Sequence, residues 1–368
     1  MQRSALFARH QALGATFVEV AEWELPQHFG DPQAEYRAVR QHVGLSDLSH
    51  RGLVRLTGAD RQRFFQALVS NDMARLQPGQ GCYATLLTNK GRIVADFVVY
   101  ADTDAYWLDL EPQMAQPFID AIDFYVIADD VSFSDETAQW GLLSLQGPNA
   151  TDLLALACGQ DLPDMPAYAH TTCVLGGQEA RLMRRSHTGE NGYQLLATPT
   201  ALPQIWDALW QHRDACNLRA VGLEALEVLR IEAGIPLFGR DMTEETIPVE
   251  ANLLEAISYT KGCYVGQEVL ARIDARGHVN RQLMGLLLEG DTLPQHGDAL
   301  ITPERKVGWI TSSAYSPALR QNIAMGYVRR EVQAPGTHVE VRTHAGTFGA
   351  TVTTLPFYSH LHPVGGNL

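Results

Sequence analysis

A tight hairpin between two apolar strands limits the fold of this chain more than any other stretch. Residues 83–88 and 93–100 are predicted as strands, and residues 89–91, Asn-Lys-Gly, form the turn between them. Because hairpins join such neighbours, the pattern favours an antiparallel α+β fold over a doubly wound parallel sheet. Residues 44–50 are predicted as a turn-rich connector before a strand at 51–56. Helical spacing of apolar residues predicts helices over residues 33–43, 60–69, 112–126, 147–156, 202–210, 221–231 and 265–275.

The last quarter of the chain has a different pattern of apolar and turn-forming residues. From Arg281 onward, short alternating segments are separated by Gly, Pro and Ser, which is typical of a small all-β barrel or sandwich. We therefore place a boundary near residues 278–282 and expect two domains, 1–280 and 281–368. The predicted strands of the second domain are residues 283–288, 307–311, 324–328, 338–342 and 349–352.

Composition excludes several classes of protein. The 28 basic and 42 acidic residues give a net charge of −14, which disfavours direct nucleic-acid binding, although a local basic patch stays open. No apolar run reaches the roughly 20 residues that span a bilayer, and no secretion signal is recognised. Five scattered cysteines without a C-x-x-C pair indicate reduced thiols in the cytoplasm. His360 and His362 lack a third ligand, so no metal site is predicted.

One cysteine stands in a context that indicates chemistry. Cys263 follows Lys261 and Gly262 and precedes the helix predicted at 265–275. A helix N-terminus and a neighbouring cation both lower the pKa of a thiol, so Cys263 and Lys261 are candidate catalytic residues. The alternative is a small buried cysteine in a tight turn.

Two acids are further candidates. Glu190 lies between Gly189 and Gly192 in a polar loop, and its carboxylate suits an amidine-like edge such as that of a pterin. The alternative for Glu190 is a solvated turn acid. Asp96 lies inside an apolar strand, where burial should raise its pKa and suit it to general-base or charge-stabilising work. The alternative for Asp96 is a structural hydrogen-bond partner. Arg230 and Glu232, at a helix end, either bind a ligand or cap the helix and form an ion pair.

Six further motifs lie at residues 44–50, 92–97, 188–193, 229–234, 315–319 and 324–328. Together, they resemble the glycine cleavage T-protein (aminomethyltransferase) superfamily along nearly the whole chain. The resemblance implies a three-lobed cloverleaf with antiparallel sheets around a central channel that holds tetrahydrofolate, plus a C-terminal barrel. It also implies that Glu190 grips the pterin and that Asp96 lies near the folate nitrogens that carry one-carbon units. We add Arg230, Tyr83 and Asn71 as expected cofactor contacts.

Residues 261–268, Lys-Gly-Cys-Tyr-Val-Gly-Gln-Glu, look like the signature of the YgfZ branch, folate-binding proteins linked to iron–sulfur cluster assembly or repair and tRNA modification. Leu226 replaces an arginine usual in aminomethyltransferases, which removes a bidentate anchor. Asp96, by contrast, is typical of the T-protein. Our leading hypothesis is a YgfZ-like protein with iron–sulfur assembly partners. The first alternative is a tetrahydrofolate-dependent aminomethyltransferase or demethylase, and the second is a scaffold that only binds partners.

Overall fold

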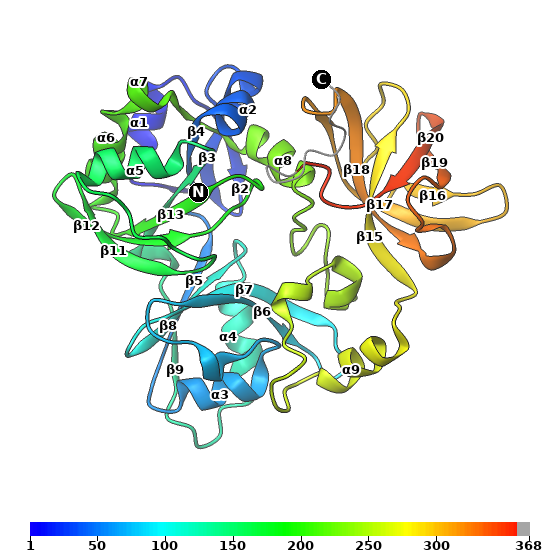
Figure 1. Ribbon diagram of the computed structural model, residues 1–368, viewed down its shortest axis with the longest axis horizontal. Helices are drawn as coiled ribbons and strands as arrows, with labels where there is room; N and C mark the ends of the chain where they lie inside the picture. The colour runs from blue at the N-terminus through cyan, green and yellow to red at the C-terminus, as the bar shows by residue number, and fades with distance from the viewer. Residues whose placement is uncertain (359–368) are drawn as a thin grey trace.

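The computed structural model describes residues 1–358, apart from the side chain of Arg276. His360, His362 and the tail at 364–368 lie outside the described residues. Figure 1 shows three lobes arranged around a common centre, with helix α8 (Leu223–Glu232) between two of them. The predicted α+β class, with antiparallel sheets and a C-terminal barrel, is confirmed. No described helix is long and apolar enough to cross a membrane.

The first lobe is built on a six-stranded sheet. Its strands are antiparallel except for β4 and β14, which run parallel. A small three-stranded sheet, ordered β1-β3-β2, lies at the N-terminus. The order and bounds of the six strands are β11 (His170–Leu175), β12 (Gln178–Arg184), β13 (Gly192–Ala197), β10 (Gly141–Gln146), β4 (Val43–Asp47) and β14 (Leu218–Ala220). The N-terminal strands are β1 (Gln2–Arg3), β2 (Thr16–Val20) and β3 (Trp23–His28).

The second lobe is a five-stranded sheet that contains the predicted hairpin. In spatial order across the sheet, its strands are β6 (Gly81–Leu87), β7 (Ile93–Ala101), β8 (Ala105–Leu110), β5 (Gly52–Thr57) and β9 (Ser132–Asp135). From Ala95 to Ala101, the odd-numbered residues of β7 pack with helices α3 (Arg61–Leu68) and α4 (Ala115–Asp123). On the opposite face, Val98 and Tyr100 join Leu142, Met183 and Leu196 of the six-stranded sheet in one core. Strand alternation thus turns one face of β7 toward the centre of the molecule.

The third lobe is a closed barrel that begins at Arg281. Its strands in order are β15 (Arg281–Leu288), β18 (Gln321–Arg329), β17 (Lys306–Ser316), β16 (Ala299–Ile301), β19 (His338–Thr343) and β20 (Gly346–Thr353). Closure removes the unpaired edges that an open sheet would expose. The remaining described helices are α1 (Phe7–Ala12), α2 (Pro32–Gln41), α5 (Ala150–Cys158), α6 (Leu202–Trp210), α7 (Arg213–Cys216) and α9 (Gln267–Arg276). Short 3-10 turns cover Met73–Arg75, Thr137–Gln139, Pro248–Ala251, Leu254–Ala256 and Arg330–Val332.

The prediction of a turn-rich connector at residues 44–50 is wrong for the first half of that stretch, because Val43–Asp47 is the buried strand β4. Gly44 is needed there for packing. A Cβ at this position would lie 2.5 Å from Cγ2 of Val39 in α2 and 2.7 Å from Cγ2 of Val221. The glycine therefore marks close packing of α2 against the sheet rather than a turn.

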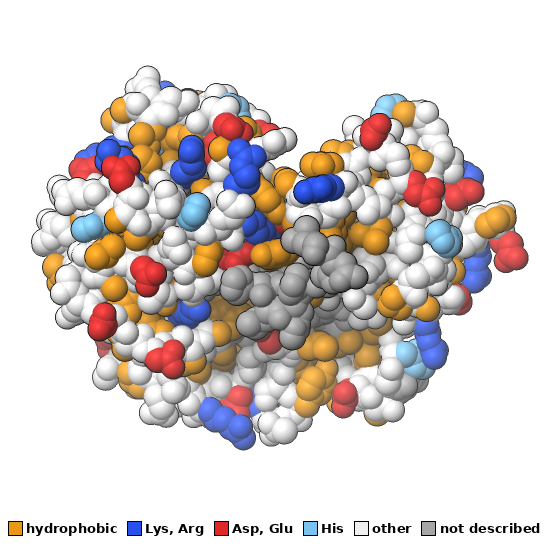
Figure 2. Space-filling view, turned by 45° about the horizontal axis from the view of Figure 1, so that its top comes forward, with side chains coloured by type: hydrophobic (Ala, Val, Ile, Leu, Met, Phe, Trp, Pro, Cys, Tyr) orange, Lys and Arg blue, Asp and Glu red, His pale blue; other side chains and the backbone are white. Residues whose placement is uncertain are grey.

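Charges are mixed on the surface. On the face shown in Figure 2, acidic and basic side chains are interspersed, and a notch separates two of the lobes. The coloured part of this face shows no broad basic surface of the kind that wraps nucleic acid, in keeping with the net charge of −14.

Candidate functional site

Asp96 lies in β7 on the face that meets the six-stranded sheet, and it is almost fully buried. The hydroxyl of Tyr83, in β6, donates a 2.6 Å hydrogen bond to Oδ2 of Asp96. The other oxygen, Oδ1, is buried and has no hydrogen-bond partner within residues 1–358. Burial, followed by the negative charge of Glu111, raises the pKa of Asp96 to about 6, as the sequence led us to expect. An unpartnered buried acceptor is costly unless a ligand or water meets it.

The charges of two arginines, Arg51 and Arg185, affect the pKa of Asp96. Arg51 donates to Asp109 at 2.5 Å and to Glu111 at 2.8 Å, and Arg185 pairs with the second oxygen of Asp109. The positive charges of Arg51 and Arg185 oppose the effects of burial and of Glu111 on the pKa of Asp96. The balance keeps Asp96 able to change its charge near neutral pH.

Glu190 is held by an arginine from a different part of the chain. Its Oε1 accepts a 2.8 Å hydrogen bond from Nη1 of Arg40 in α2, and Nη2 of Arg40 donates to Glu232 at 2.6 Å. The ring of Tyr358 lies 3.9 Å from the Arg40 guanidinium carbon. Glu190 is only 4% exposed, so the interpretation of Glu190 as a solvated turn acid is wrong. The carboxylate instead belongs to a buried group in which one arginine pairs with two carboxylates.

Arg230 has no donor left for a ligand. A guanidinium group has five N–H donors. Those of Arg230 reach both oxygens of Glu227 at 2.7 and 2.6 Å, Asp241 at 2.7 Å, Ser312 at 2.7 Å and the carbonyl of Ile235 at 3.1 Å. Of the two alternatives for Arg230, the geometry favours the structural ion pair over the cofactor contact. Arg230 links α8 to β17 of the barrel.

Lys261 and Cys263 do not form the pair that the sequence led us to expect. The ammonium group of Lys261 is buried and donates at 2.7 Å to the carbonyls of Val69 and Asn71. Burial lowers the pKa of Lys261 to about 8, and the thiol whose pKa its charge affects is that of Cys82. Cys263 is exposed and lies four residues before α9 begins. The prediction that Lys261 activates Cys263 is therefore corrected, and so is the buried-cysteine alternative.

Asn71 supports Tyr83 rather than facing a ligand. Its side-chain amide nitrogen donates to the carbonyls of Tyr83 at 2.7 Å and Glu255 at 2.9 Å. Its side-chain oxygen accepts from the backbone N–H of Asp72 at 2.8 Å. With both N–H groups and the oxygen engaged, Asn71 fixes the backbone next to Tyr83. Tyr83 itself donates to Asp96, so the structure links four predicted site residues in a row: Lys261, Asn71, Tyr83 and Asp96. Only the contact between Tyr83 and Asp96 joins two side chains.

Sequence reasoning missed the arginines of these groups. Arg40 pairs with Glu190 and Glu232, Arg51 with Asp109 and Glu111, and Arg185 with Asp109. Arg40 lies 150 residues from Glu190, and Arg51 lies 58 residues from Asp109. The only signal for Arg51 is its position directly after the motif at 44–50. Within the described chain, no cluster of three or more His, Cys, Asp or Glu residues could hold a metal ion.

Comparisons with known families agree with this architecture. Residues 6–261 match the GCVT N-terminal domain, and residues 281–359 match the glycine cleavage T-protein C-terminal barrel domain. A crystal structure of the glycine cleavage system aminomethyltransferase T from Bartonella henselae superposes with a TM-score of 0.88. It is 25% identical, and the match covers 97% of this chain and 98% of that one.

Relatives of full length carry the same name. The chain is 34% identical to an aminomethyltransferase of Rubrobacter xylanophilus, over 100% of this chain and 97% of the relative. It is 35% identical to an aminomethyltransferase of Thermosynechococcus vestitus, over 97% of this chain and 96% of the relative. These matches support the superfamily and give no support to the YgfZ branch. The chain belongs to the glycine cleavage T-protein family.

Proposed function

We propose that this protein is a tetrahydrofolate-dependent one-carbon transferase of the aminomethyltransferase type. The observation that carries the proposal is Asp96, a buried carboxyl group with one oxygen held by Tyr83 and the other without a partner among the described residues. The full-length likeness to aminomethyltransferases supports the same activity. The comparisons thus favour the alternative that the sequence left open over the iron–sulfur hypothesis.

The residues present fit a folate. Oδ1 of Asp96 can accept an N–H from a bound amine or a folate nitrogen, and Glu190 offers a buried carboxylate of the kind that recognises an amidine-like pterin edge. When bound, tetrahydrofolate supplies the nitrogens that take up the one-carbon unit. Binding of tetrahydrofolate or a one-carbon derivative, its contact with Glu190 and a cytoplasmic location stay predictions.

Asp96 acts on protons and charge. With a pKa of about 6, its carboxyl group is mostly ionised at neutral pH. The ionised Oδ1 can accept a proton from an N–H or stabilise positive charge that develops on a nearby nitrogen. Tyr83 fixes the carboxylate by holding Oδ2, so the acceptor does not need to reorient during the reaction.

Leu226 bears on the choice of amine. Like Tyr83 and Tyr168, it is partly buried and packs against the core where the two central sheets meet. An apolar side chain there cannot anchor a carboxylate as a guanidinium would. We infer that the part of the substrate next to Leu226 is apolar or uncharged, which favours a methylated or carrier-linked amine without a free carboxylate at that place.

The test measures turnover by the purified protein with tetrahydrofolate and either a methylated or a lipoyl-linked amine. We expect Asp96→Asn to abolish product formation and Cys263→Ala to keep it. Titration calorimetry with tetrahydrofolate should show binding that Glu190→Ala weakens. Turnover that requires Cys263 but not Asp96 would overturn the proposal and favour the iron–sulfur hypothesis. That hypothesis would then be tested by asking whether Cys263→Ala still complements the activity of iron–sulfur enzymes.

A further inference from the structure

A basic pocket opens at the edge of the barrel, and Asp96 is not among the residues that line it. It has a volume of about 630 Å³, which suits a small organic molecule. Residues from β15, β17, β18 and the 3-10 turn at Arg330–Val332 line it. Four of the lining residues are cations: Arg281, Lys306, Arg329 and Arg330. Glu331 is the one acid among the lining residues, and it pairs with Arg305 at 3.0 Å. We call this site the barrel pocket.

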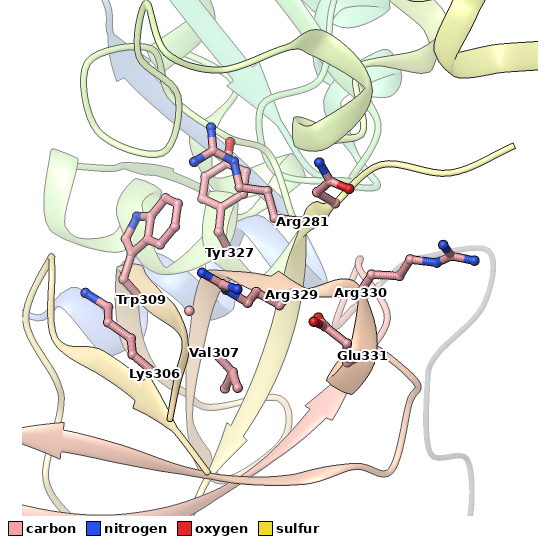
Figure 3. Close-up of a pocket in the computed structure, with 10 residues that line it drawn as sticks. Arg281, Lys306, Val307, Trp309, Tyr327, Arg329, Arg330 and Glu331 are labelled. Carbon is pink, nitrogen blue, oxygen red and sulfur yellow. The ribbon is translucent and has the colours of Figure 1, made fainter. Parts of the chain in front are cut away.

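Three of the cations gather around one aromatic ring. Figure 3 shows Arg281, Arg329 and Lys306 around Trp309, while Arg330 points away from them. Trp309 stacks on Tyr327 with ring centroids 5.0 Å apart, and the guanidinium of Arg281 lies 5.1 Å from the Trp309 ring. The stacked rings form a flat, rigid wall that could carry the uncharged part of a ligand.

The arrangement of the two arginines is unfavourable without a counter-charge. Arg281 and Arg329 are direct partners across the β15–β18 ladder. Like charges opposite each other destabilise a sheet. Arg281 is compensated in part, by Glu250 at 3.1 Å and the carbonyl of Glu245 at 2.9 Å. Arg329 and Lys306 make no ion pair with any described residue at contact distance.

We propose that the barrel pocket binds a small organic anion that carries at least two phosphate or carboxylate groups. Arg329 and Lys306, on neighbouring strands, form no ion pair at contact distance with a described residue, although the charge of Arg329 also acts on Glu331. Arg281 adds a third cation. A ligand with two or more negative groups satisfies them together, whereas the net charge of −14 repels anions from most of the surface. The proposal does not depend on the folate activity, because none of these residues belongs to the Asp96 or Glu190 groups.

The test is titration calorimetry of the full-length protein at low salt with pyrophosphate, citrate and a nucleoside diphosphate. We expect at least one of them to bind with a dissociation constant of about 1 mM or tighter, and the binding to weaken as salt is added. Tighter binding of pyrophosphate than of citrate assigns phosphate as the anionic group, and the reverse order assigns carboxylate. Absence of binding by all three overturns the proposal.

Charge reversal locates the site. Arg329→Glu should weaken binding by more than about tenfold, since a charge-assisted contact is lost and a repulsion gained. Lys306→Glu is a second exposed variant in case the first unfolds, and thermal unfolding checks both. The matched control is Arg342→Glu, an exposed barrel cation outside the pocket with the same change in net charge. Equal weakening by Arg342→Glu would show a general charge effect and overturn the proposal. Tetrahydrofolate binding should be unchanged in all three variants.

Discussion

Replacing Arg230 with alanine separates a structural arginine from a ligand-binding one. The change removes five hydrogen bonds and leaves Asp241, which is 1% exposed, without its counter-charge. Removing one member of a buried ion pair costs about 3–5 kcal/mol of unfolding free energy. With an unfolding entropy of about 2.1 cal/mol/K per residue, this lowers the melting temperature of a 368-residue chain by about 4–6 °C.

The assay is thermal and urea unfolding, followed by titration of the folded variant with tetrahydrofolate. Arg240→Ala is the matched control, because Arg240 pairs with the same Glu227 at 2.8 Å but is 46% exposed. We expect the control to lose no more than about 1 kcal/mol. The reasoning is refuted if Arg230→Ala melts with the wild type but no longer binds tetrahydrofolate, since Arg230 would then contact the ligand.

Four further predictions concern other residues. The wild-type transfer rate should fall as the pH drops through about 6, where Asp96 gains its proton, and a flat profile would contradict its role. Because burial raises the pKa of Asp96 above its unfolded value of 3.8, wild-type stability relative to Asp96→Asn should decline as the pH rises from about 4 to about 6, measured by urea unfolding. Lys261→Met should leave the alkylation rate of Cys263 unchanged by mass spectrometry, whereas a marked slowing would restore Lys261 as its activator. Gly44→Ala should cost about 1–3 kcal/mol in chemical denaturation, since the new methyl group meets Val39, and an unchanged midpoint would count against this packing argument.

Local patterns were enough for the regular elements. The hairpin appears as β6 and β7, the helix predicted at 202–210 is α6, and each predicted barrel segment lies within or overlaps a barrel strand. In these stretches, periodicity and turn residues agree with the final fold. Strand β4 was not predicted because Gly44, Ser46 and Asp47 have low strand propensity. Burial between β10 and β14 overrides that preference.

The site was predictable only in its acids. Asp96 and Glu190 are conspicuous because a carboxylate interrupts an apolar strand or a glycine-rich loop. Arg40 and Arg185 carry no such mark, since an arginine in an amphipathic helix or at a strand end usually lies in solvent. Folding of the first lobe brings Glu190 to Arg40, and packing of two lobes brings Asp109 to Arg185. Spacing along the chain encodes neither approach. The same limit explains Lys261, whose nearest neighbours in sequence are not its partners in space.

Glu232 joins parts of the protein that lie far apart along the chain. It accepts hydrogen bonds from Tyr36 and Arg40 of α2 and from Ser316 of β17. Cutting the gene after residue 280 would therefore do more than delete a barrel. It would take a donor from a buried carboxylate that shares Arg40 with Glu190. We expect that chimaeras exchanging barrels between relatives work only when the incoming barrel brings a hydroxyl group to this place.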